Sequence, residues 1–72
     1  MASTEVKVPE RVARHTGYIK EQLTELRDHV REDVGEVEDD KAEALFETTA
    51  EVLQGLITAF EHFERRSEEA WR

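Results

Sequence analysis

Apolar residues occur with helical spacing in two segments of the chain, and the two segments differ in the width of their apolar surface. Residues 9–34 carry a stripe that is one residue wide for most of its length: Val12, Ile19, Leu23, Leu26, Val30 and Val34. Residues 41–63 carry two adjacent seams. The first comprises Ala42, Leu45, Thr49, Val52, Leu56, Ala59 and Phe63, and the second Phe46, Ala50, Leu53, Ile57 and Phe60. Because steps of three and four place residues on one helical face, the pattern predicts two amphipathic helices, the second with the wider apolar surface.

Proline, glycine and aspartate residues indicate where the two helices begin and end. Pro9 suits the first turn of a helix, where its missing N–H has no intrahelical partner anyway, and Gly35 is a typical residue just past a helix end. We therefore expect an N-terminal extended or frayed segment over residues 1–8 and a helical hairpin over 9–72. Within the hairpin we expect one helix over about 9–34, a turn over 35–40 and a second helix over about 41–70. Either Asp39 or Asp40 can cap the second helix, and Asp40 with Glu43 has capping-box spacing.

The two seams of the second helix predict self-association. The chain has only 72 residues and no cysteine, so disulfides and thiolate zinc sites are excluded, and oligomerisation is the ordinary way to stabilise so small a core. A lone antiparallel hairpin buries one seam per helix, so we expect a dimer that forms a four-helix bundle. Its predicted interface is the seam of Phe46, Ala50, Leu53, Ile57 and Phe60. The predicted core comprises Val12, Ile19, Leu23, Leu26, Val30, Leu45, Phe46, Val52, Leu53, Leu56, Ile57, Phe60 and Phe63.

The chain is strongly acidic, with 18 Asp and Glu against 10 Lys and Arg, for a net charge of −8. Such a charge disfavours binding to nucleic-acid backbones and anionic membranes. It suits either a protein kept soluble in concentrated salt or an ordinary acidic surface. Glu43, Glu47 and Glu51 repeat every four residues and predict an acidic patch that faces either a basic protein partner or solvent. A short turn would bring Arg31 near Glu43 and Arg27 near Glu47.

The chain contains neither a run of about 20 apolar residues nor a basic start followed by an apolar segment. We therefore expect a cytoplasmic protein without a membrane partner.

Metal and catalytic chemistry have little support in the sequence. No His follows a Glu by three residues, the signature of dimetal bundles, although Glu25, His29 and Glu32 share a helical face and could hold one divalent cation. His15 and His62 lie too far apart in one hairpin to share a metal, but could meet across a dimer. No nucleophile motif or glycine-rich phosphate loop is present, so we expect no enzyme activity and no cofactor.

Two further features have alternative interpretations. Gly17 and Gly55 would lie at one level of the hairpin, where they could permit a close helix crossing. Trp71 could cover the end of the bundle against Val6 or Val8, or could contribute to an interface.

Residues 5–10, Glu-Val-Lys-Val-Pro-Glu, resemble the opening of ribbon-helix-helix repressors. The resemblance implies an N-terminal strand that pairs with a second chain and reads the DNA major groove. The chain departs from that family because Gly17 comes only eight residues after Pro9 and because Glu5 and Lys7 nearly cancel in charge. The long second helix also has no counterpart in the minimal fold.

Taken together, these patterns predict a small acidic protein that acts as a non-enzymatic, homo-oligomeric interaction or regulatory module. The alternatives are a DNA-linked, antitoxin-like regulator that uses the N-terminal strand, and a metal-binding carboxylate and histidine bundle.

Overall fold

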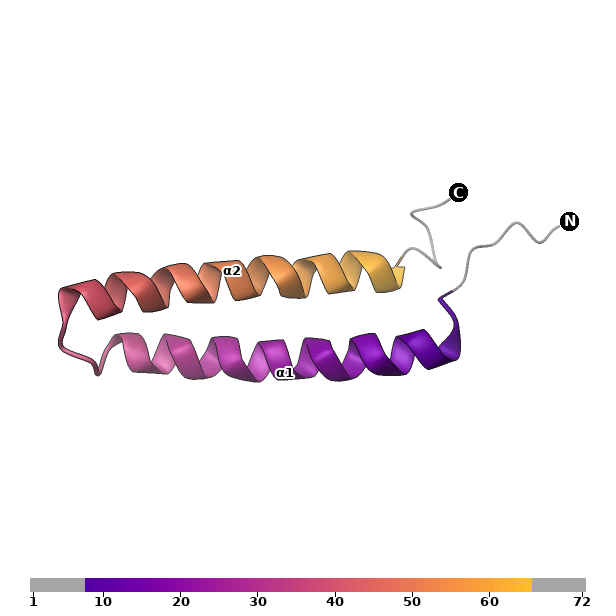
Figure 1. The fold of residues 1–72 in the computed structure, drawn as a ribbon, viewed down its shortest axis with the longest axis horizontal. Coiled ribbons are helices and arrows are strands. Elements are labelled where there is room, and N and C mark those ends of the chain that lie inside the picture. The colour runs from indigo at the N-terminus through magenta and orange to yellow at the C-terminus, as the bar shows by residue number, and fades with distance from the viewer. Residues whose placement is uncertain (1–7, 66–72) are drawn as a thin grey trace, which may run out of the picture.

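The chain folds as two helices joined by a short turn (Figure 1). The structure, a computed structural model, describes residues 8–65. Helix α1 spans Glu10–Val34 and α2 spans Asp40–Arg65, and the two run antiparallel, side by side. The predicted all-α hairpin is therefore confirmed. Residues 1–7 of the expected N-terminal segment and residues 66–70 of the expected second helix lie outside the described residues.

The two helices begin in different ways. At α1, the Pro9 carbonyl accepts a bond from the N–H of Ala13 at 2.9 Å, and no side chain caps the helix. At α2, the side chain of Asp39 accepts a bond from the N–H of Ala42 at 2.9 Å. Asp39 is therefore the N-cap, and the alternative with Asp40 as the cap is not formed. The Asp39 carboxylate accepts a bond from an N–H that has no partner within the helix, and its negative charge complements the positive end of the helix dipole.

The turn places its unusual backbone conformation at Glu38 instead of at a glycine. Gly35 follows the last helical residue, as its position predicted, but keeps a right-handed conformation with φ −80°. Glu38 instead has φ 49°, in the left-handed region that costs an L-residue about 1–2 kcal/mol. The turn therefore contains local strain at a residue whose side chain is exposed.

Relieving this strain should stabilise the hairpin. We expect Glu38→Gly to raise the free energy of unfolding by about 0.5–1 kcal/mol, because glycine adopts positive φ without a Cβ clash but loses more backbone entropy on folding. The matched control is Glu36→Gly, which removes the same charge from the same turn at a residue without positive φ. Urea denaturation should show a higher midpoint for Glu38→Gly and an unchanged or lower one for Glu36→Gly. Equal midpoints would contradict the prediction.

The core of a single chain is small and comes from α2. Among the described residues only Ala50, Leu53 and Ile57 are buried, at 6%, 8% and 3% exposure, and α1 contributes no buried residue. These three belong to the seam that was predicted to form the oligomer interface. That assignment is wrong, because the structure packs this seam against α1 of the same chain and leaves its ends, Phe46 and Phe60, half-buried. Both seams of α2 are apolar, so helical periodicity alone did not distinguish the inward one.

The pairing of the two helices also differs from the prediction. The Arg27 Nη1 atom donates to Gln54 Oε1 at 2.6 Å, so Arg27 lies beside a residue seven positions further along α2 than the predicted Glu47. The predicted Arg31–Glu43 pair is likewise not formed. The cause is the turn, which runs outward along the hairpin axis, so that α2 begins beyond the end of α1 (Figure 1). The resulting shift is close to two helical turns.

Candidate interaction surface

Besides Tyr18, which points away from α2, five large apolar side chains among the described residues are exposed to solvent. They are Leu45, Val52, Leu26, Leu56 and Ile19, with exposures of 61%, 57%, 50%, 44% and 43%. All five were predicted to lie in the core of the dimeric bundle, and in the single chain they are exposed, so their burial in a dimer stays a prediction. We call these five residues the apolar face.

Helical geometry places the five residues on one side of the hairpin. Each directly precedes a residue on the inward side of its helix, and one step toward the N-terminus rotates a side chain by about 100° about the helix axis. In two antiparallel helices this rotation leads toward the same side of the pair. The adjacent residues, with the apolar-face residue first and the inward residue second, are Ile19 and Lys20, Leu26 and Arg27, Leu45 and Phe46, Val52 and Leu53, and Leu56 and Ile57.

Charged side chains are absent from this side over most of its length. Between residues 12 and 26 of α1 and residues 42 and 63 of α2, the other positions with the same helical phase hold no Asp, Glu, Lys or Arg. They are Val12, His15, Gln22, Ala42, Thr49, Ala59 and Phe63. In a chain of which 39% is charged, a contiguous uncharged face of this kind is typical of an interaction surface.

A shallow pocket continues the apolar face toward the open end of the hairpin, the end opposite the turn. It is lined by Thr16 of α1 and by Ala59, Phe60 and Phe63 of α2. The pocket therefore spans both helices and is almost entirely apolar.

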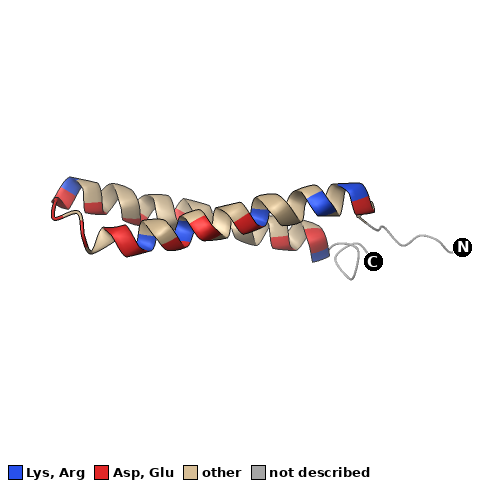
Figure 2. Cartoon of the chain, turned by 90° about the horizontal axis from the view of Figure 1, so that it is seen from below, with Lys and Arg blue, Asp and Glu red and all other residues tan. Residues whose placement is uncertain are grey.

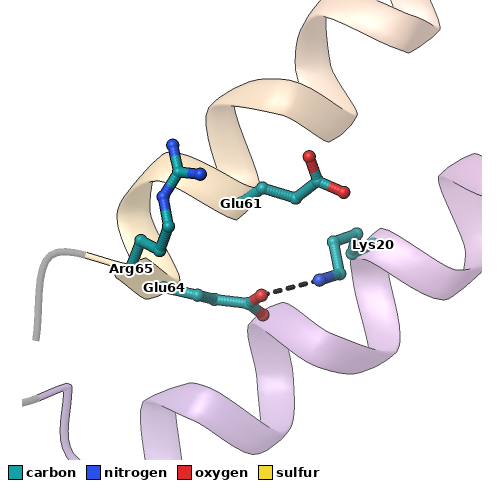
Figure 3. A pocket seen from close by; sticks show the side chains of 4 residues that line it. All are labelled: Lys20, Glu61, Glu64 and Arg65. Atoms are coloured by element: carbon teal, nitrogen blue, oxygen red, sulfur yellow. Dashed lines mark hydrogen bonds and ion pairs between the residues drawn. The ribbon is translucent and has the colours of Figure 1, made fainter. Parts of the chain in front are cut away.

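Polar contacts hold the two helices together near the open end (Figure 3). The Lys20 Nζ atom lies 2.7 Å from Glu64 Oε1, and the Thr16 hydroxyl donates to Glu64 Oε2 at 3.2 Å. Both partners of the ion pair are about 70% buried, with side-chain exposures of 30% and 28%. Lys20 and Glu64 line a second, polar pocket together with Glu61 and Arg65. These contacts fix the pairing of α1 with α2, and they were missed from the sequence because the predicted pairing was displaced.

The predicted acidic patch lies on the turn half of α2. Glu47 and Glu51 are exposed, whereas Glu43 is half-buried. Arg31 of α1 lines a shallow pocket together with Glu47 and Glu51, so the structure brings this arginine to a different part of the patch than predicted. A partner for the patch remains a prediction.

The candidate metal ligands do not come together. The His29 Nε2 atom lies 3.2 Å from Asp33 Oδ2, and Glu25 and Glu32 are exposed. Within residues 8–65 no group of three or more His, Asp or Glu side chains is placed to hold a metal ion. The structure therefore does not bring Glu25, His29 and Glu32 together, and His29 instead pairs with Asp33, toward the C-terminal side of the helix.

The glycines do not mark a close helix crossing. A Cβ atom added at Gly17 or Gly55 would meet no atom within 4 Å, so both positions face open space. The shifted pairing also removes them from a common level. Trp71, the other feature left open by the sequence, lies outside the described residues.

Negative charge is concentrated in the half of the hairpin that contains the turn (Figure 2). Residues 28–51, the turn half, hold ten acidic and two basic side chains, for a net charge of −8. Residues 8–27 and 52–65, the open half, hold five of each and are neutral. The hairpin is therefore a rod with one strongly negative end.

Comparisons with known proteins do not assign the chain to a protein family. No family model, no curated protein and no solved structure matches the chain. Neither helix in the described part of the chain has the length and apolar character needed to cross a bilayer.

Proposed function

We propose that this chain is a non-enzymatic interaction module that works as a homodimer, in which two hairpins pack through their apolar faces into a four-helix bundle. The observation that carries the proposal is the apolar face itself, which is large, uncharged and exposed in a single chain. A second copy of the hairpin offers a face of the same shape and the same lack of charge. Pairing the two covers both at once.

The energies involved are of the size that a dimer requires. Full burial of a Leu, Ile or Val side chain contributes about 1.5–3 kcal/mol, so covering half of each of ten such side chains contributes about 8–15 kcal/mol. Association costs about 4–15 kcal/mol in lost rigid-body freedom. The half-buried Val12 and Phe63, which share the helical phase of the face, add to the gain.

The acidic turn half supports a second element of the proposal. In the bundle, Glu47 and Glu51 stay on the outside, because they lie away from the apolar face. We propose that this surface takes a basic protein segment as its partner, with long-range attraction that falls as salt rises.

Absolute mass in solution tests the dimer. We expect light scattering to give twice the 8.4 kDa chain mass, with a helical circular dichroism spectrum, at both ~0.1 M and ~2 M salt. A disordered monomer at low salt that assembles at high salt would support self-association and show that charge repulsion opposes it. A stably folded monomer at both salts would overturn the proposal, because the apolar face would then be stable in water without a partner.

A further inference from the structure

We infer that the second copy docks on the apolar face in the opposite direction, so that the acidic turn half of each hairpin lies beside the neutral open half of the other. This inference rests on the proposed dimer and specifies its arrangement. In a two-fold dimer of face-to-face hairpins, opposite directions place α2 on α2 of the partner and α1 on α1. The same direction would place α2 on α1 of the partner.

The distribution of charge favours the opposite direction. Packed helices lie about 8–10 Å apart, within the Debye length of about 10 Å at 0.1 M salt, so charges on adjacent ends repel each other with little screening. The same direction would gather two ends of net charge −8 side by side. The opposite direction separates the centres of the two turn halves by about half the length of the hairpin, roughly 20 Å or two Debye lengths, at which screening removes most of the repulsion.

The apolar pattern of α2 favours the same arrangement. Its exposed seam, from Ala42 to Phe63, alternates steps of three and four without interruption over most of the helix. A seam of this kind packs along a second helix that carries an equal seam. On α1 the apolar face holds only two exposed large apolar side chains, Ile19 and Leu26, so the best match for α2 is α2 of the partner.

The pairing within one hairpin identifies which residues meet at the two-fold axis. Because Arg27 lies beside Gln54, each residue of α1 can be matched to the residue of α2 at the same height along the hairpin. The middle of the hairpin then falls near Leu56 on α2 and Leu26 on α1. With full overlap in the opposite direction, each of these two leucines lies against its own copy. Leu45 lies eleven positions from Leu56, so the two copies of Leu45 would be about 33 Å apart.

Single cysteines test this arrangement cleanly, because the chain has no cysteine of its own. A disulfide needs Cα atoms within about 7 Å. After mild oxidation we expect Leu56→Cys and Leu26→Cys each to form covalent dimers in most chains, as judged on a non-reducing gel. When the two variants are mixed and allowed to exchange subunits before oxidation, we expect little covalent dimer between Leu26→Cys and Leu56→Cys. Leu45→Cys, an exposed control on the same face, should stay uncrosslinked.

The outcomes separate the inference from the proposed dimer. Mixed Leu26→Cys and Leu56→Cys dimers in place of the self-linked ones would show the same direction and overturn the inference, while leaving the homodimer in place. Both kinds of product, or no covalent product from either variant although the wild type has the mass of a dimer, would also overturn it. A wild type with the mass of a folded monomer would instead remove the proposed function, and the inference with it.

Discussion

Replacing Leu53 with aspartate should unfold the hairpin at room temperature. Leu53 is one of three buried side chains in the described chain, at the centre of the contact between α1 and α2. The substitution forfeits about 1.5–3 kcal/mol of apolar burial and places an unpaired carboxylate in the core at a cost of several kcal/mol more. Because a core of this size supplies no more than about 3–5 kcal/mol, we expect circular dichroism to show loss of most helical signal.

A matched control separates core disruption from added charge. Thr48→Asp introduces the same carboxylate into the same helix at an exposed position. We expect this variant to keep its helical spectrum and to melt within a few degrees of the wild type, since exposed substitutions usually change stability by less than about 0.5 kcal/mol. An unaltered melting curve for Leu53→Asp would show that the contact between the two helices is not as described.

Replacing Leu56 with glutamate should dissociate the proposed dimer. Leu56 is 44% exposed in the single chain, so a glutamate there can reach water in the monomer. In the dimer the substitution brings two carboxylates to the middle of the apolar interface, which we expect to cost at least about 4 kcal/mol, or about a thousandfold in the dissociation constant. Sedimentation equilibrium at micromolar concentration should then give the mass of one chain, whether or not that chain remains helical.

Tyr18→Glu provides the control for this second substitution. Tyr18 is even more exposed, at 64%, but lies two positions before the inward Lys20 and therefore points away from α2 and from the apolar face. We expect this variant to retain the dimer mass. A Leu56→Glu variant that dimerises as tightly as Tyr18→Glu would show that the apolar face is not the surface used.

The elements of the fold were predictable from local chemistry. Helical spacing identified both helices, and a proline, a glycine and an aspartate marked their ends. Such signals act within a few residues and do not depend on what the helix packs against. The positive φ at Glu38 was not predictable, because no residue type in the turn other than glycine signals it strongly.

The choice of inward seam and the pairing of the helices depend on information that periodicity does not contain. Both seams of α2 have enough apolar surface to pack against α1. The inward side of α1 includes Lys20 and Arg27, whose alkyl stems can cover apolar neighbours while their charged ends bond to Glu64 and Gln54. A count of apolar residues alone overlooks such positions, so the predicted stripe of α1 combined half-buried residues such as Leu23 and Val30 with the exposed Ile19 and Leu26. Periodicity therefore predicted two apolar seams on α2 but not which of them packs against α1, although Leu53 and Ile57 of the predicted core are buried in the single chain.

The absence of buried residues from α1 has a consequence for how the chain tolerates mutation. A position constrained by packing accepts few side chains, whereas a partly exposed position accepts many. All three buried positions and most of the apolar face lie on α2. Apart from Thr16, Lys20 and Arg27, whose side chains bond to α2, we therefore expect α1 to accept more substitutions than α2 without loss of the fold.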